Sequence, residues 1–279
     1  MHEQDYVKEM LTRTCLYFSE AAADRVRNAT MAIAGMGGVG SITVELLARW
    51  GVRKFRLLDM DKYEPTNLNR QLFATSSTLG QYKVDVAAER IKEINPHAEI
   101  EMLVKDMVHN ENAPQFVDGA NIVIQNADRP SAKLLYNAAR KFKVPLVNGY
   151  ATVSGGRVQT FDFHNSECTS KLEEWWNKQK QIDGKRLEDM TPEEVLHYDK
   201  NYVHATAPSV NFVTNMVGCL IVAEAVKLLT GEGRNVLYPK YLEFDTFNFN
   251  MKVRNSLSPL DPGNVKRAKK LVQKTLGKG

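Results

Sequence analysis

The stretch MAIAGMGGVGSITVELLARWG, residues 31–51, decides the fold class. It begins with apolar residues typical of a short buried strand, and after the glycines apolar residues recur at helical spacing until Gly51, where a helix would end. Gly35, Gly37 and Gly40 match G-x-G-x-x-G at the junction. Glycines there permit a tight turn and let the backbone approach a phosphate at the positive end of the helix. The stretch therefore predicts a nucleotide-binding strand, turn and helix.

Strands and helices alternate along the first half of the chain. The segment ANIVIQNAD, residues 120–128, is apolar at nearly every position, as in a parallel strand covered on both faces. Strands that alternate with helices predict a doubly wound, Rossmann-like, mainly parallel α/β sheet with helices on both faces. The other strands predicted in this half are 54–61, 99–106 and 144–150, and the other helices are 76–96 and 131–143.

The pattern changes after residue 153. GGRVQTFDF predicts a return strand, and a polar segment with Trp175 and Trp176 predicts a helical insertion over one face of the core. A mostly buried helix and then one or two antiparallel strands follow. We therefore expect one domain over 1–256, with a core at about 28–155, an insertion at about 165–207 and a C-terminal helix and strands at about 208–256, followed by a basic tail at 257–279.

The composition narrows the class of protein. With 279 residues and 43% hydrophobic content, the chain can bury a substantial core. It has no run of eighteen uncharged apolar residues, and residues 1–13 carry acids and lack the apolar block of a signal peptide, so we expect a cytoplasmic protein that makes no use of a membrane. The formal charge of +4 is small, and the tail predicts a solvated helix or a disordered end, which leaves tRNA open as a partner.

Charged and amide residues cluster after the second predicted strand. Asp59 follows the glycine turn by about twenty residues, where a carboxylate accepts hydrogen bonds from ribose hydroxyls. The loop DMDKYEPTNLNRQLF adds Asp61, two asparagines and Arg70, and Lys83 follows. Cations and amides suit the β- and γ-phosphates of a triphosphate, whereas hydride transfer does not need them. Asp128, which ends the fourth predicted strand, is the candidate magnesium ligand.

These motifs occur in the order of a known family. Through GMGGVGS, LLDMDKYEPTNLNRQ, GQYK, INP and NAD, the chain resembles the ThiF/MoeB family of ubiquitin-activating-like (HesA/MoeB/ThiF) adenylyltransferases over roughly Thr12 to Asn255. The NLNRQ run after an LLDxD strand is far more specific than the glycine turn. The resemblance implies an enzyme that binds Mg-ATP and transfers AMP to a carboxylate, usually the C-terminal glycine of a ubiquitin-like or sulfur-carrier protein, with release of pyrophosphate.

The resemblance also implies roles for individual residues. Arg13, in LTRTCLYF, resembles the arginine that family dimers donate into the neighbouring subunit's ATP site, which implies a homodimer. The chemistry agrees, because an ionised carboxylate that attacks the α-phosphorus needs positioning and charge neutralisation rather than a general base. The implied contacts are Gly38 with the phosphates, Asp59 with the ribose, Asn67 near the phosphates, Arg70 and Lys83 with the β- and γ-phosphates, and Asp128 with Mg²⁺.

The chain departs from the family pattern at two places. Gln125 stands where many relatives carry an acid, and Lys133 stands where an arginine is frequent. These exchanges either weaken metal binding and impair catalysis or merely tune the site. The paired CxxC motifs of many relatives are replaced by Cys168 alone, so we expect no structural zinc. Relatives without zinc include the dehydratase branch that adenylates a threonylcarbamoyl carboxylate on tRNA, and this activity stays an alternative.

Few other residues point to chemistry. Cys168 follows the return strand in a polar loop, where an exposed thiol could form a thioester, but a single cysteine gives no evidence for a lowered pKa. Cys219 is predicted to be a small core residue, and Cys15 to pack beside Leu16. Trp175 and Trp176 are predicted to pack the insertion onto the core rather than to line the acceptor site, and His204 to be an ordinary loop or core residue.

The sequence thus predicts a homodimeric, magnesium-dependent adenylyltransferase that forms an acyl-adenylate. The acceptor carboxylate belongs to a small carrier protein, a peptide or a modified tRNA. Two alternatives use the same fold, namely an NAD-dependent oxidoreductase and a non-catalytic nucleotide-binding protein. The first alternative predicts affinity for NAD over ATP and no role for Arg70, and the second predicts ATP binding without pyrophosphate release.

Overall fold

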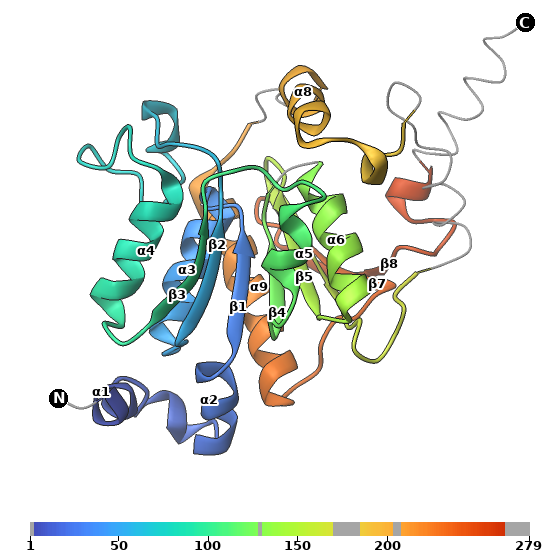
Figure 1. Ribbon diagram of the computed structural model, residues 1–279. Coiled ribbons are helices and arrows are strands. Elements are labelled where there is room, and N and C mark those ends of the chain that lie inside the picture. Colours follow the sequence, from blue (N-terminus) through green and yellow to red (C-terminus); the bar gives the residue numbers. More distant parts are fainter. Residues whose placement is uncertain (1–2, 128–129, 170–184, 203–207, 266–279) are drawn as a thin grey trace, which may run out of the picture.

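The computed structural model describes residues 3–127, 130–169, 185–202 and 208–265 (Figure 1). Across these residues the chain forms one eight-stranded sheet with the order β3-β2-β1-β4-β5-β6-β7-β8. The first five strands in this order are parallel, and each later strand is antiparallel to its neighbour. The predicted doubly wound, mainly parallel sheet with a C-terminal antiparallel extension is confirmed.

The parallel strands bring their carboxyl ends to one edge of the sheet. Ala34, the last residue of β1, pairs with Leu58 at the end of β2 and with Gln125 at the end of β4. The segments that follow these three strands are therefore neighbours, although they are far apart in the sequence. The parallel strands are β1 (Thr30–Ala34), β2 (Lys54–Leu58), β3 (Glu99–Val104), β4 (Ile122–Gln125) and β5 (Leu146–Ala151).

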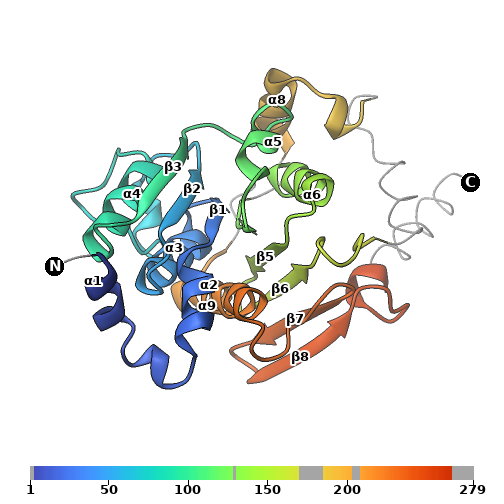
Figure 2. The same cartoon turned by 60° about the horizontal axis from the view of Figure 1, so that its bottom comes forward.

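The antiparallel extension widens the sheet beyond β5, as Figure 2 shows. It consists of β6 (Gly155–Phe161), β7 (Lys240–Asp245) and β8 (Asn250–Asn255). A Cβ atom on Gly156 would lie 2.4 Å from Val217 in the helix that crosses this part of the sheet. Glycine is therefore what allows that helix to approach the strands closely.

Helices cover both faces of the sheet (Figures 1 and 2). One core cluster joins the sheet to α3 (Gly38–Arg49), α4 (Lys83–Ile94) and α9 (Asn211–Thr230), and includes Ile33, Ile124 and Val217. The second cluster lies on the opposite face against α5 (Asn112–Val117) and α6 (Ser131–Phe142). Alternate residues of each strand supply the two clusters, as the two-residue repeat of a strand requires.

Helix α9 is unusually apolar. Within the described residues it is the single helix long and apolar enough to cross a membrane, a criterion that core helices of globular proteins also meet. Half of its apolar window, 50%, is buried inside the protein. The opposite side of α9 is exposed and carries Phe212, Met216 and Cys219, so the prediction that Cys219 is a core residue is wrong. The helix is buried on one side only, and Cys219 falls on the other.

Several elements were not predicted or start elsewhere. Helix α4 begins at Lys83 rather than at residue 76, because Gly80 takes a left-handed φ of 81° and the Thr78 hydroxyl accepts a hydrogen bond from the Thr75 N–H in a preceding turn. Helices α1 (Glu3–Met10), α2 (Glu20–Arg27) and α5 escaped the sequence patterns, as did the 3₁₀ turns η1 (Thr14–Leu16) and η2 (Pro65–Asn67).

The predicted insertion is helical where it is described. It contains η3 (Leu187–Asp189) and α8 (Pro192–Tyr202), and Val195 of α8 is fully buried in the second core cluster. Asn110, before α5, donates hydrogen bonds to the carbonyl oxygens of Glu188 and Met190, both at 2.9 Å. The predictions for Trp175, Trp176 and His204 fall outside the described residues. The single-domain boundaries stay a prediction.

Candidate nucleotide-binding site

The glycine turn is packed too tightly for side chains. Gly35 has a φ of 87°, and a Cβ atom on it would lie 2.6 Å from the backbone nitrogen of Ala127. A Cβ atom on Gly40 would lie 1.7 Å from the carbonyl oxygen of Gly35, and one on Gly38 would touch Thr214 of α9 at 3.2 Å. Gly37 caps the twelve-residue helix α3. The first N–H groups of α3, which have no partner within the helix, therefore face the carboxyl edge of the sheet.

Asp59 ties the turn to the next strand. Its two carboxylate oxygens accept hydrogen bonds from the Met36 N–H at 2.6 Å and the Asp61 N–H at 2.9 Å. Burial raises the pKa of Asp59, and the nearby Lys83 cation opposes this effect. The carboxylate is thus fixed beside the glycine turn, where its remaining lone pairs are available to ribose hydroxyls.

Lys83 reaches the same place from the start of α4. Its Nζ lies 2.8 Å from Oδ2 of Asp61, and its backbone N–H donates to the Asp61 carbonyl at 3.0 Å. The side chain of Lys83 is 7% exposed, whereas that of Asp61 is 48% exposed. The buried ammonium group of Lys83 is thus held at this edge beside the carboxyl groups of Asp59 and Asp61.

Arg70 and Asn67 follow η2 in the loop after β2. Asn67 is buried, and its Oδ1 accepts from the Glu64 N–H at 3.1 Å, so its amide serves to hold the loop. The Nη1 of Arg70 donates to the Thr66 carbonyl at 2.8 Å and to Oδ1 of Asn69 at 2.9 Å. Both acceptors are neutral, so they orient the guanidinium group without neutralising its charge.

Unpaired buried polar atoms gather around the turn. Within the described residues, four of the seven buried side-chain nitrogen or oxygen atoms without a hydrogen-bond partner belong to Tyr63, Gln71 and Asn126. Burial raises the pKa of Tyr63, and so does the charge of Asp59. Gln71 and Asn126 were missed as site residues, although the quoted NLNRQ and NAD motifs contain them. Orphaned polar groups beside a glycine cradle fit a polar ligand such as a nucleotide phosphate.

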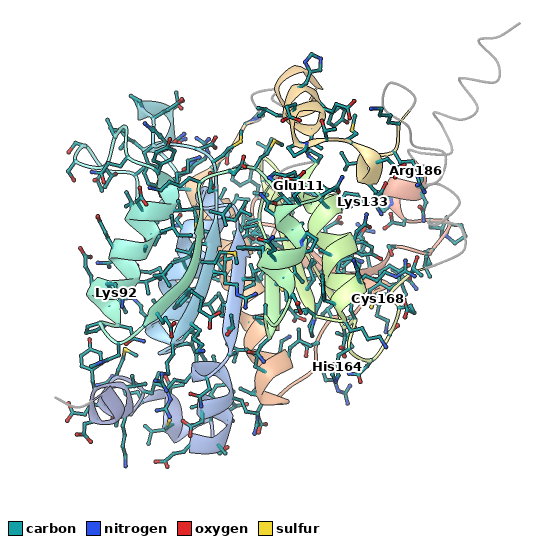
Figure 3. All side chains as sticks on the ribbon, viewed as in Figure 1. Lys92, Glu111, Lys133, His164, Cys168 and Arg186 are labelled. Atoms are coloured by element: carbon teal, nitrogen blue, oxygen red, sulfur yellow. The ribbon has the colours of Figure 1, made fainter. Side chains whose placement is uncertain are left out.

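The predicted magnesium ligand cannot be placed, because Asp128 falls outside the described residues. Gln125 is buried, and its Nε2 donates to the Ala127 carbonyl. Lys133, in the first turn of α6, holds its Nζ 5.1 Å from the centre of the Tyr136 ring (Figure 3). In the part of the chain that the structure describes, no three His, Cys, Asp or Glu side chains form a metal site. The magnesium prediction therefore stays a prediction.

Arg13 lies away from the turn. It is exposed and precedes η1, between α1 and α2, at the amino ends of the strands (Figure 1). The glycine turn follows the opposite end of β1, whose five residues span about 17 Å. Cys15, next to η1, packs near Val7, Leu11 and Ala23, whereas Leu16 is exposed.

Cys168 is not the exposed thiol that the polar loop predicted. Its residue is 4% exposed and lies in the second core cluster beside α6 (Figure 3). The Tyr136 hydroxyl donates to the Cys168 carbonyl at 2.8 Å, and Phe163 packs against the Tyr136 ring. Burial raises the pKa of the Cys168 thiol, which disfavours the reactive thiolate. The geometry therefore gives no support to a nucleophilic Cys168.

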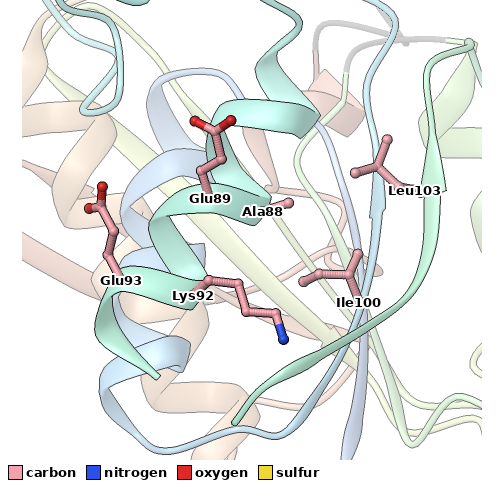
Figure 4. Close-up of a pocket in the computed structure, with 6 residues that line it drawn as sticks. All are labelled: Ala88, Glu89, Lys92, Glu93, Ile100 and Leu103. Atoms are coloured by element: carbon pink, nitrogen blue, oxygen red, sulfur yellow. The ribbon is translucent and has the colours of Figure 1, made fainter. Parts of the chain in front are cut away.

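A separate groove of about 660 Å³ lies between α4 and the edge strand β3 (Figure 4). Its floor is largely apolar, and its sides carry charges from α4. None of the residues predicted for the site contributes to it. The lining residues are Ala88, Glu89, Lys92, Glu93, Ile100 and Leu103.

The fold and the site together define a class. A parallel sheet with the order 3-2-1-4-5, a glycine turn between β1 and α3, and a carboxylate at the end of β2 characterise a Rossmann-like nucleotide-binding protein. The family model described as "ThiF family" matches residues 11–263. The chain belongs to the ThiF family, and the family resemblance is confirmed.

Similar proteins of known name agree with this assignment. The chain is 39% identical over 139 residues to the tRNA threonylcarbamoyladenosine dehydratase of Bacillus subtilis (strain 168), covering 49% of this chain and 54% of that protein. It is 31% identical over 160 residues to the molybdopterin-synthase adenylyltransferase of Salmonella typhimurium, covering 56% of this chain and 64% of that protein. The chain thus matches little more than half the length of these relatives.

A solved structure of Escherichia coli MccB with AMPCPP and MccA has the same fold. It superposes with a TM-score of 0.70 at 17% identity, over 90% of this chain and 72% of that one. At this level of identity, the likeness confirms the fold.

Proposed function

We propose that the protein is an ATP-dependent adenylyltransferase that activates a carboxylate as an acyl-adenylate and releases pyrophosphate. The observation that carries this proposal is the arrangement of Asp59 and Lys83 beside the glycine turn, with Arg70 oriented in the loop after β2, in a chain of the ThiF family. Names of relatives support it, since molybdopterin-synthase adenylyltransferase is one of them and MccB has been solved with ATP. A cytoplasmic location is part of the proposal.

The proposed reaction forms one bond to phosphorus and breaks another. A carboxylate oxygen of the acceptor attacks the α-phosphorus, the bond from that phosphorus to the bridging oxygen breaks, and the electron pair leaves with pyrophosphate. Lys83 and Arg70 bind the departing phosphates, and the N–H groups of α3 hold the phosphate chain. The nucleophile is already ionised, so no side chain has to remove a proton. Mg²⁺, held by Asp128 in this proposal, would neutralise part of the phosphate charge.

We favour a small protein or a peptide as the acceptor. The name of the molybdopterin-synthase adenylyltransferase gives a protein, molybdopterin synthase, as the molecule that is adenylylated. The structure of MccB has been solved with MccA. The second candidate is a carboxylate on tRNA, because the dehydratase of Bacillus subtilis is 39% identical over its matched part. The two candidates differ in their requirement for RNA.

A homodimer is the second part of the proposal. An exposed apolar surface spans α9 and the β7–β8 hairpin, and the rings of Phe212 and Phe247 lie 6.1 Å apart within it. Met251 pairs with Phe244, whose ring belongs to the core under α9, so Met251 continues the same face. Exposed apolar patches of this kind mark interfaces. The members of this apolar surface are Phe212, Met216, Phe247, Phe249, Met251 and Val253.

A partner subunit would also give Arg13 a role. The length of β1 separates Arg13 from its own glycine turn, so it can serve a nucleotide only in another subunit. Subunit mixing tests this arrangement. Arg13→Ala and Lys83→Met should each be inactive, whereas an equal mixture that exchanges subunits should recover roughly a quarter of wild-type exchange activity, since half of the dimers have one intact site. A monomer in solution, or no recovery after exchange, contradicts the homodimer.

Exchange of labelled pyrophosphate into ATP tests the proposed reaction. We expect exchange that depends on an acceptor and on Mg²⁺, tested with a panel of small proteins and peptides with free C-termini and with total tRNA, with and without ribonuclease. Arg70→Ala should remove exchange while the circular dichroism spectrum stays unchanged, because Arg70 makes its contacts within an exposed loop. Thermal stabilisation by NAD but not by ATP contradicts the proposal, as does ATP binding without exchange with every acceptor.

A further inference from the structure

Asn126 has a buried amide with no hydrogen-bond partner among the residues that the structure describes. Both Nδ2 and Oδ1 are buried without a hydrogen bond, although the backbone N–H of Asn126 continues the sheet by donating to the Ala34 carbonyl at 2.8 Å. The Nδ2 atom lies 3.6 Å from the place where a Cβ atom on Gly40 would be. The amide therefore lies against the first turn of α3, on the β4 side of the glycine turn.

Gln71 has an unpaired group on the other flank. Its residue is 6% exposed, and its Oε1 is buried without a partner. Its Nε2 lies 3.8 Å from the Cβ position of Gly37, the residue that caps α3. The two amides come from loops after β2 and β4 and flank the same turn.

Unpaired amides are expensive inside a protein. A buried polar group without a partner lowers folding stability, because the hydrogen bonds that it made with water are not replaced, so native proteins keep few of them. Asn95, a buried amide near the amino end of β2, illustrates the usual case. Asn95 is fully buried, and its Nδ2 donates to the Val52 carbonyl at 3.1 Å while its Oδ1 accepts from the His97 N–H at 3.3 Å. The unpaired amide atoms of Asn126 and Gln71 do not stabilise the fold, which points to a ligand as their hydrogen-bond partner.

We propose that Asn126 and Gln71 are nucleotide-contacting residues whose side-chain amides bind phosphate oxygens of ATP from the two flanks of the glycine turn. This inference rests on the proposed function. The amide nitrogens, Nδ2 of Asn126 and Nε2 of Gln71, donate hydrogen bonds without positive charge and so position the phosphate chain, while Lys83 and Arg70 supply the charge. The unpaired oxygens accept from hydroxyl groups or from water that accompanies the nucleotide. Asn126 lies where the strand order reverses, between β1 and β4. In this proposal it contacts the triphosphate near the α-phosphate.

Apolar replacements of similar size test the inference, because they separate folding from binding. In Asn126→Leu and Gln71→Met the unpaired amide is removed, so the melting temperature of the free protein should be unchanged or higher. The increase in melting temperature on addition of ATP should shrink, and the KM for ATP should rise about tenfold for each replacement. A residue that only supports the fold would give the opposite pair of results.

Asn95→Leu is the matched control, since it removes a buried amide whose hydrogen bonds are made. It should lower the melting temperature of the free protein and leave the ATP-induced increase intact. The inference is overturned if Asn126→Leu behaves like Asn95→Leu, or if both site variants respond to ATP as the wild type does. These results leave the proposed function standing, whereas a wild-type protein that ATP does not stabilise overturns both.

Discussion

The Nζ of Lys83 lies 2.8 Å from Oδ2 of Asp61, and the backbone of the same two residues is joined by a hydrogen bond of 3.0 Å. The start of α4 is thereby fixed to the loop after β2. An ammonium group has three donors, so the ion pair occupies one and leaves two for phosphate oxygens. The pair orients Lys83 toward the edge of the sheet on which the glycine turn lies.

Lys83→Met should reduce pyrophosphate exchange at least about a hundredfold, because it removes a fixed cation from the departing phosphates and leaves the apolar part of the side chain. Asp61→Asn should cost less than about tenfold, since the backbone hydrogen bond still holds Lys83 in place. Exchange rates at saturating ATP measure both effects. Lys54→Met is the control, because Lys54 is paired with Glu101 at 3.0 Å at the opposite end of β2 and should have no effect.

The steric room at each glycine of the turn predicts which substitutions the turn tolerates. In Gly40→Ala the new Cβ would meet the Gly35 carbonyl oxygen at 1.7 Å, so we expect a loss of at least about 3 kcal/mol of stability or a turn that no longer binds ATP. In Gly37→Ala the atoms nearest to the new Cβ belong to the Gln71 side chain at 3.8 Å, an ordinary contact, so we expect a smaller loss. Denaturant unfolding and ATP-induced thermal shifts compare the two variants. Equal stability of both would contradict the geometry.

The strand, turn and helix at 31–51 could be predicted because their signals are local. The glycine spacing, the apolar run before it and the helical repeat after it all occur within one short segment. The place of Asp59 also followed from the sequence, since the end of β2 neighbours the end of β1 in a parallel sheet. These features fix the architecture and half of the site.

The remaining features depend on contacts between distant segments. The bond between the Lys83 N–H and the Asp61 carbonyl fixes the start of α4 to the loop after β2, and Cys168 is buried in a core cluster with residues of α6, where the Tyr136 hydroxyl bonds its carbonyl. The roles proposed for Asn126 and Gln71 rest on hydrogen bonds that they do not make, which no sequence pattern reveals. The sequence therefore located the site, but it could not tell which side chains in the site motifs are already satisfied.

The two cysteines should react in the reverse of the order that the sequence predicted. Cys219 is exposed on α9, whereas Cys168 is 4% exposed, and burial raises the pKa of both thiols, so access to the reagent decides the order. Brief treatment of the protein with iodoacetamide near pH 7.5 should spare Cys168 and label Cys219, the latter most readily after dilution to monomers because Cys219 shares its side of α9 with Phe212 and Met216. Peptide mass spectrometry measures both. Cys168→Ala should keep full pyrophosphate exchange. A thioester at Cys168, or its preferential labelling, would contradict the buried position.

Tyr63→Phe should change how stability depends on pH. Tyr63 is 1% exposed, its hydroxyl has no partner, and burial together with the charge of Asp59 raises its pKa. The unfolded chain loses the phenolic proton near its ordinary pKa of about 10, while the folded protein keeps it, so the wild type loses stability as the pH rises through this range. Tyr63→Phe should lose less stability between about pH 9 and pH 11 in urea unfolding, and should stay within about 1 kcal/mol of the wild type at pH 7.

Tyr241→Phe is the control, because it removes the donor that bonds Asp261 at 2.5 Å and should already destabilise the protein at pH 7. If Tyr63→Phe instead lost several kcal/mol at neutral pH, its hydroxyl would have to be held by the folded protein.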